Sequence, residues 1–243
     1  MVNPVLLNNV DHADIRVLTG HGAAFGDAVN QMTVFPTEYE ALQREYPILL
    51  RKDADEGGYR SVVLLGLDQD ENLFLTEDGW QGRAVPALLQ RGPFSIGLPP
   101  PARDRTTQGE PMIHIDLDHP RVSREAGAPI FLPQGGNSPY LDHVAGVLRA
   151  IYVGSEVTRP IFEAFDKLDL IEPITIEIKL DNGRQYHVPD GHTISHERLM
   201  QLDGEPLERL HRADFLRPAI WIASSLQNFG RLTDIKNQRE RAA

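Results

Sequence analysis

SVVLLGLDQDENLFLTEDGW, residues 61–80, is the densest apolar block of the chain, and our prediction of the fold starts from it. The nearly unbroken apolar run over residues 62–67 predicts a strand that is buried on both faces. Acidic and amide residues at 68–71 are typical of a loop, and residues 72–76 can form a return strand. We therefore predict a β-hairpin around which the N-terminal half is arranged.

Shorter patterns predict the other elements of the N-terminal half. Apolar runs or alternation predict strands at residues 14–19, 48–51, 93–97 and 112–117. The glycine-rich stretch 20–26 resembles the start of a dinucleotide-binding loop, but its third glycine comes one residue late. A flexible turn is the better interpretation of that stretch.

The C-terminal half combines helices with one clear strand pair. Pro139 after Ser138 is typical of a helix start, and apolar spacing predicts two helices, 139–152 and 159–168, packed as a helical hairpin. Alternation over residues 174–188 around Asn182-Gly183 predicts a β-hairpin with a type I′ turn. Further helices are expected at residues 195–202, 206–212 and from 214 onward.

Together these elements predict an α+β fold, in which a lobe with a mixed or antiparallel sheet precedes a β-hairpin and a helical C-terminal lobe. Four prolines between residues 97 and 111 suggest a boundary. We expect an N-terminal lobe at 1–98, a proline-rich linker at 99–111 and a C-terminal lobe at 112–243. Whether the lobes share one core is left open.

Composition argues against several classes of partner. The net charge of −11 opposes binding to nucleic acid and to anionic membranes. Residues 231–241 are locally basic, and we expect a solvated helix end there. No apolar run is long enough for a membrane span, and the N-terminus lacks the features of a signal peptide, so we expect a cytoplasmic protein.

Short motifs spread from about residue 9 to 238 resemble the SapC family of bacterial proteins. They include Phe35-Pro36, Tyr46-Pro47-Ile48, Glu71-Asn72-Leu73-Phe74, Gly79-Trp80, Ile115-Asp116, Pro120-Arg121-Val122 and the segment 225–229. The family's name comes from surface-layer systems, and similar proteins are encoded beside halogenase-like proteins, cupin-like oxygenases and TonB-dependent receptors. The resemblance implies a non-catalytic accessory protein that recognises a protein or peptide partner in a cell-envelope, surface-layer or uptake pathway.

Six residues in or beside these motifs are our candidates for binding a partner. They are Glu71, Asn72, Trp80, Asp116, Asp118 and Arg121. For Glu71 and Asn72 we favour a structural role, in which they hydrogen-bond locally at the turn, over a role in which they face a partner. The resemblance supplies no catalytic residues, and no cofactor is expected on this interpretation.

An alternative rests on His114-Ile-Asp116, because His-x-Asp with a distant histidine is the ligand set of non-haem iron oxygenases. His187 would be the third ligand, and the protein would bind Fe(II) as a 2-oxoglutarate-type oxygenase. His12-Ala-Asp14 shows the same spacing, so such a match also arises by chance. Whether the chain is an enzyme is left open.

Overall fold

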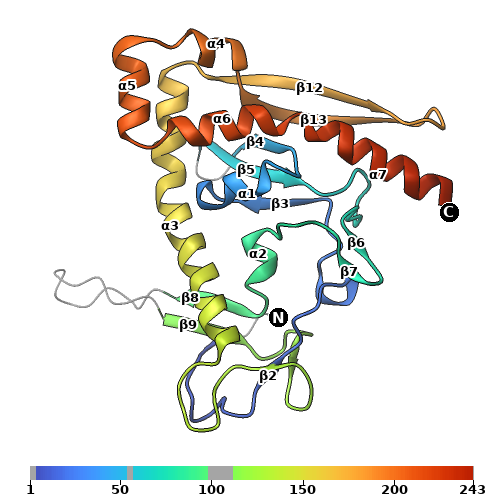
Figure 1. The fold of residues 1–243 in the computed structure, drawn as a ribbon, viewed down its shortest axis with the longest axis vertical. Coiled ribbons are helices and arrows are strands. Elements are labelled where there is room, and N and C mark those ends of the chain that lie inside the picture. The colour runs from blue at the N-terminus through green and yellow to red at the C-terminus, as the bar shows by residue number, and fades with distance from the viewer. Residues whose placement is uncertain (1–3, 54–56, 98–111, 243) are drawn as a thin grey trace. The chain divides into compact units, whose positions relative to one another are not determined.

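The computed structural model describes residues 4–53, 57–97 and 112–242, and it divides the chain into two compact units (Figure 1). The first unit comprises residues 1–27 and 87–152, and the second comprises residues 28–86 and 153–243. Each unit therefore combines segments of both predicted lobes. The predicted linker lies outside the described residues, and the division at 99–111 stays a prediction.

The first unit contains two small antiparallel sheets and one core. One sheet has the order β1 (Pro4–Leu6), β9 (Met112–Asp116), β8 (Phe94–Gly97), and the other has the order β10 (Val122–Ser123), β2 (Arg16–Val17), β11 (Ala128–Pro129). Helical elements are the short η1 (Ala23–Phe25), α2 (Ala87–Gln90) and the first half of α3 (Pro139–Lys167). The core consists of Ile15, Val17, Phe94, Ile115, Ile130, Phe131, Leu141, Val144 and Leu148.

The second unit is built on a five-stranded antiparallel sheet. Its order is β12 (Ile171–Lys179), β13 (Gln185–Ile194), β4 (Ile48–Lys52), β5 (Tyr59–Leu64), β3 (Gln31–Val34). The pair β6 (Leu75–Thr76) and β7 (Gly79–Trp80) stands beside it. The helical elements are η2 (Pro36–Glu38), α1 (Tyr39–Leu42), α4 (His196–Gln201), α5 (Gly204–Arg212), α6 (Leu216–Ser225) and α7 (Asn228–Ala242). Helices and antiparallel sheets with a helical C-terminal region confirm the predicted α+β class.

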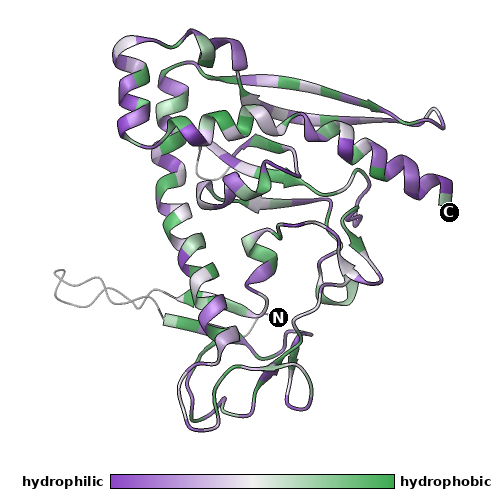
Figure 2. Ribbon diagram, viewed as in Figure 1, coloured by the Kyte–Doolittle hydropathy of each residue, from purple (hydrophilic) through white to green (hydrophobic). Residues whose placement is uncertain are grey.

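The strand predicted at 62–67 forms, but its predicted hairpin partner is wrong. Residues 61–65 are all buried, as expected for a strand covered on both faces. However, β5 pairs with β4 on one edge and with β3 on the other, so no edge is left for residues 72–76. These residues instead end in β6, which pairs with β7. In Figure 2 the apolar colouring is strong on β4 and β5 and gives way to hydrophilic residues along the end of α7.

Residues 139–167 form one helix, α3, and not the predicted helical hairpin. Ser138 caps its start, since its hydroxyl accepts a hydrogen bond from the Leu141 N–H at 3.2 Å. Pro160 lies inside the helix and removes one backbone hydrogen bond. Burial of Phe162 and Phe165 on the same helix outweighs this loss, so the helix continues through the proline.

The hairpin predicted around Asn182-Gly183 is confirmed and extends over β12 and β13. Its turn differs from the prediction because a type I′ turn needs positive φ at both central residues. Gly183 has φ 85° and Asn182 has a negative φ. The Gly183 N–H donates to the Leu180 carbonyl at 3.0 Å, which is the pattern of a type I turn followed by a glycine bulge.

Candidate functional site

A cavity of about 260 Å³ lies within the first unit. Its apolar wall comes from Pro4 and from residues of η1 and α2, including Phe25 and Leu88. Its polar groups come from segments far apart in the sequence: Asp27, Arg91, Ser95, Asp116, His119 and Arg121. Convergent ionisable groups in a concave site are the usual mark of a binding or active site.

Asp27 and Arg121 form a buried ion pair at the cavity wall. The two side chains are 3% and 4% exposed, and Arg121 Nη2 lies 2.7 Å from Asp27 Oδ2. The same carboxylate oxygen accepts hydrogen bonds from the Gly22 N–H at 2.9 Å and from His21 Nδ1 at 3.2 Å. Burial alone would raise the pKa of Asp27, but these hydrogen bonds and the charge of Arg121 lower it below its ordinary value. Asp27 is therefore ionised at neutral pH.

Arg121 is also held by uncharged groups. Its guanidinium donates to the carbonyls of Leu18 and Gly20, and it lies 4.5 Å from the centre of the Phe25 ring. Hence Arg121 holds the glycine-rich stretch 20–26 in place, and its positive charge is balanced by Asp27.

His119 is neutral and fixed in the cavity. Its Nδ1 accepts the Arg121 backbone N–H at 3.1 Å. Burial and the positive charge of Arg121 lower the pKa of His119, against the opposing effect of Asp116. Because Nδ1 is used as an acceptor, it cannot donate to a carboxylate as the histidine of a serine triad does.

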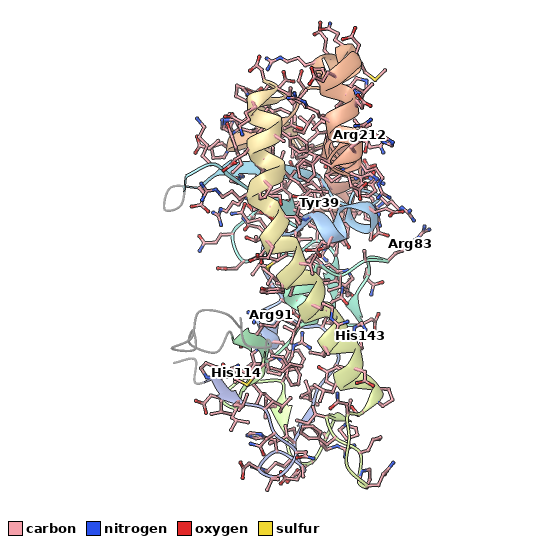
Figure 3. The ribbon with its side chains drawn as sticks, turned by 90° about the vertical axis from the view of Figure 1, so that its left-hand side faces the viewer. Tyr39, Arg83, Arg91, His114, His143 and Arg212 are labelled. Carbon is pink, nitrogen blue, oxygen red and sulfur yellow. The ribbon has the colours of Figure 1, made fainter. Side chains whose placement is uncertain are left out.

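Arg91, which is labelled in Figure 3, directly follows α2. Unlike Arg121, it forms no ion pair among the described residues. Its Nη1 donates to the Phe94 carbonyl at 2.8 Å. Its Nε is buried and has no hydrogen-bond partner in the described part of the chain. Burial lowers its pKa, although an arginine still carries its charge at neutral pH. The cavity wall thus contains a cation with unused donor capacity.

Two of the six predicted binding residues, Asp116 and Arg121, line this cavity. Asp118 is exposed, and its N–H donates to Asp116 Oδ1 at 3.2 Å. Glu71, Asn72 and Trp80 belong to the second unit. The predicted set is therefore divided between the two units.

Glu71 and Asn72 make the local hydrogen bonds that the structural interpretation predicts. Glu71 Oε2 accepts from the N–H groups of Leu67 and Asp68, and Asn72 Oδ1 accepts from the Phe74 N–H at 3.0 Å. Trp80 donates through Nε1 to the Ala84 carbonyl at 3.1 Å and packs edge-on against Tyr46. Whether these residues also bind a partner stays a prediction.

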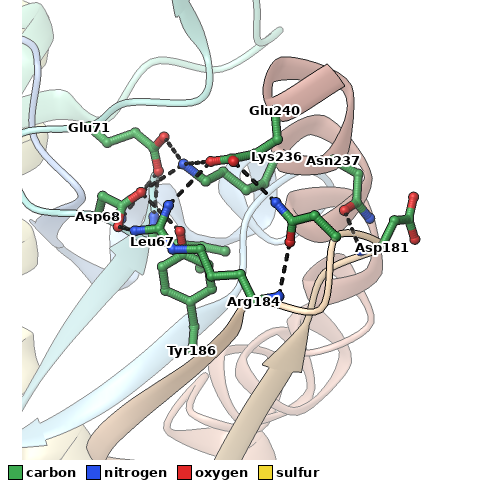
Figure 4. A network of polar contacts seen from close by, with 10 residues as sticks. Leu67, Asp68, Glu71, Asp181, Arg184, Tyr186, Lys236, Asn237 and Glu240 are labelled. Carbon is green, nitrogen blue, oxygen red and sulfur yellow. Dashed lines mark hydrogen bonds and ion pairs between the residues drawn. The ribbon is translucent and has the colours of Figure 1, made fainter. Parts of the chain in front are cut away.

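Lys236 on α7 joins the loop after β5 to the C-terminal region (Figure 4). Its ammonium lies 2.7 Å from oxygens of both Asp68 and Glu71, and 3.1 Å from Glu240. Arg184 of the hairpin turn binds Asp68 from the other side at 2.8 Å. The prediction of a solvated basic end at 231–241 is wrong here, because the Lys236 side chain is only 6% exposed.

The predicted iron ligands are not assembled within either unit. His114 and Asp116 are on β9 in the first unit, and His187 is on β13 in the second. Within residues 4–53, 57–97 and 112–242, no group of three or more His, Asp or Glu side chains is placed to hold a metal ion. The Fe(II) alternative stays a prediction that no contact in the described residues supports.

Sequence reasoning missed Asp27, Arg91 and His119. Asp27 and Arg121 are 94 positions apart, and Arg91 stands in an Arg-Gly-Pro turn that matches no binding motif. Among the polar groups of the cavity, a signal was available for Asp116 and Arg121, through the motifs Ile115-Asp116 and Pro120-Arg121-Val122. The remaining polar groups become neighbours only when the small sheets of the first unit form.

Motifs that carry the family resemblance meet in the second unit. Ser225 Oγ accepts the Ile48 N–H at 2.9 Å, and Asn228 Nδ2 donates to the Tyr46 carbonyl at 3.2 Å. The C-terminal motif therefore holds the Tyr46-Pro47-Ile48 motif in place, which gives both a structural role.

No helix in the described part of the chain is long and apolar enough to cross a membrane. No curated protein and no solved structure matches the chain. The sequence model of the SapC family matches residues 7–232, which is most of the chain. The chain therefore belongs to the SapC family.

Proposed function

We propose that this protein is a non-catalytic accessory protein of a bacterial cell-envelope, surface-layer or TonB-dependent uptake pathway, and that it recognises a protein or peptide partner. Membership of the SapC family supports the pathway. The cavity of the first unit is the proposed recognition site, since it is the place where Asp116 and Arg121 meet further ionisable groups.

The state of His119 is the observation that carries the binding role. A general base must be free to take a proton from a nucleophile within hydrogen-bond reach. His119 is held through Nδ1 by the Arg121 N–H, and among the described residues no hydrogen bond joins it to Ser95 in the same cavity. Asp27, which is the buried carboxylate, is balanced by Arg121. These groups provide a fixed polar surface, which suits recognition.

The test is capture of a partner by the full chain from the native cell, followed by measurement of the dissociation constant with the purified partner. Ser95→Phe would fill part of the cavity, because Ser95 lines it. Ala13→Phe places the same side chain at an exposed position of the same unit and serves as the matched control.

We expect Ser95→Phe to weaken partner binding roughly tenfold or more, as expected when a bulky side chain blocks a contact worth about 1.4 kcal/mol. Ala13→Phe should bind like the unmodified chain. Failure of the unmodified chain to bind any purified candidate would overturn the proposed role. Equal binding of the partner by Ser95→Phe and Ala13→Phe would show that the cavity is not the recognition site.

A further inference from the structure

We infer that Arg91 is the receptor for a carboxylate of the bound peptide, which enters the cavity of the first unit. This inference rests on the proposed binding function and names the chemistry of the ligand. It has three grounds: the unused donors of Arg91, the charges around it, and the size of the cavity.

The first ground is the hydrogen bonding of Arg91. A guanidinium carries five N–H donors, and buried donors without partners are rare in folded proteins. Arg91 Nε is buried without a partner in the described residues, and Nη1 donates to the Phe94 carbonyl. Nη2 makes no hydrogen bond among the described residues and is not among the fully buried atoms without a partner, so it is the donor that meets an acceptor supplied from outside the chain. Arginine binds planar carboxylates in a two-bond geometry that uses neighbouring N–H groups.

The second ground is charge. The chain carries a net charge of −11, so its acidic residues outnumber the basic residues with which they can form ion pairs. Asp27 is taken by Arg121 at 2.7 Å, and Arg91 forms no ion pair within the described part of the chain. An anionic ligand would therefore neutralise the cation of Arg91 without displacing an existing ion pair.

The third ground decides the class of anion. Asp116 also lines the cavity, and its negative charge opposes a doubly charged phosphate more than a singly charged carboxylate. Pockets for drug-sized ligands have volumes of roughly 300–1,000 Å³, so a cavity of about 260 Å³ suits one residue of a peptide. A carboxylate at the C-terminus or on an acidic side chain has the required chemistry.

The test uses the full chain and four small probes: N-acetylalanine, which has a terminal carboxylate; N-acetylglutamate α-amide, which has a side-chain carboxylate; N-acetylalanine amide, which has none; and inorganic phosphate. The readout is the NMR resonance of the Arg91 Nε–H group together with the dissociation constant. We expect one of the two carboxylates to shift this resonance saturably and to bind roughly tenfold tighter than the amide, as expected for a charge-assisted hydrogen bond. The tighter carboxylate identifies a terminal or a side-chain group.

Arg91→Gln should weaken binding of that carboxylate at least tenfold, whereas Arg149→Gln should leave it unchanged. Arg149 is the matched control because it is an exposed arginine of the same unit. Arg91→Lys keeps the charge and loses the two-bond geometry, so we expect an intermediate loss. If Arg91→Gln fails to fold, the resonance of the unmodified chain and the Arg91→Lys variant decide the question.

Several results would overturn the inference: phosphate binding more tightly than both carboxylates, the amide binding as well as the carboxylates, or no saturable shift of the Arg91 resonance. Failure of the proposed function is distinguishable, because it requires that the unmodified chain retain no partner. If a partner is retained and Arg91→Gln binds it equally well, the binding function stands and the role of Arg91 falls. If small carboxylates bind through Arg91 and no partner is retained, the role of Arg91 stands and the proposed binding function falls.

Discussion

Lys236 shows how one buried charge can hold distant segments together. Burial would lower the pKa of its ammonium, but hydrogen bonds to Asp68, Glu71 and Glu240 raise it above the ordinary value. The pKa of Asp68 is lowered in turn, since its contacts with Lys236 and other donors outweigh the effect of burial. Lys236 and Asp68 are therefore both charged at neutral pH, and each charge compensates the other.

Lys236→Met should lower the free energy of unfolding by about 2 kcal/mol, because it leaves neighbouring carboxylates without their cation. The loss of stability is smaller than for a fully buried ion pair because Asp68 is partly exposed. Urea unfolding at pH 7 measures the change. Lys179→Met, at an exposed position of β12, is the control and should change stability by less than about 0.5 kcal/mol. Equal losses in the two variants would contradict the assigned role.

Asp27→Asn should destabilise the protein by roughly 3 kcal/mol at pH 7, because the buried Arg121 loses its counter-charge. The folded state lowers the pKa of Asp27, so the unfolded state binds more protons and stability rises with pH. The stabilisation by ionised Asp27 is complete above pH 3.8, the ordinary pKa of this side chain. It is lost as the pH falls through the lower pKa that Asp27 has in the folded state. The difference between variant and unmodified chain should therefore shrink below pH 3.8.

Urea unfolding as a function of pH measures this effect, with Glu125→Gln as the control for loss of an exposed carboxylate in the same unit. A difference that stays constant down to about pH 3 would show that the charge of Asp27 is not what stabilises the protein.

Among the elements, α3 offers two glycines with opposite surroundings. A Cβ at Gly146 would meet nothing within 4 Å, whereas a Cβ at Gly154 would lie 2.5 Å from Phe35 Cβ and 2.7 Å from Thr37 Oγ1. Gly154 thus allows the helix to approach the segment before η2. Gly146 has no comparable contact.

Gly146→Ala should raise the free energy of unfolding by about 0.5–1 kcal/mol, because alanine has the higher helix propensity. Gly154→Ala should lower it by roughly 1–3 kcal/mol, because the new methyl group overpacks the contact with Phe35 and Thr37. Thermal unfolding of the two variants compares them directly. A higher free energy of unfolding in both variants would contradict the tight contact at Gly154.

The elements also show which features the sequence predicts. Strand β4 and the pair β12 and β13 were predicted from apolar runs and alternation. These patterns reflect which side chains along a strand are buried. The partners of β5 did not follow, because an apolar run shows that a strand is buried but not which strands lie at its two edges. The continuity of α3 through Pro160 was missed because its apolar face is stabilised by packing, which a local breaker rule does not include.

At the scale of the whole molecule, each unit is built from two stretches that are separated in the sequence. In the first unit β9 pairs with β1 and β8, and in the second β13 joins β12 to β4. This arrangement also explains why only part of the site was predicted. Asp116 and Arg121 stand in recognisable motifs, whereas Asp27 and Arg91 are recognised as site residues only because they line the same cavity as residues distant in sequence.

A fragment of residues 1–97 should not fold alone, because it lacks β9 of the first unit and β12 and β13 of the second. Its NMR spectrum should show poor dispersion, and denaturant unfolding should lack a cooperative transition. Mixing it with a fragment of residues 112–243 should restore both. Cooperative unfolding of the 1–97 fragment by itself would favour the division into lobes at 99–111.

The pairing of β2 with β10 also has a consequence for the newly made chain. Val17 finds its partner at Val122, so roughly 100 residues must be translated between them. At about 5–20 residues per second, this stretch takes on the order of 5–20 s on the ribosome. For that time the apolar groups of Ile15 and Val17 lack their native cover. We therefore expect chaperones that bind nascent apolar segments to bind this early part of the chain.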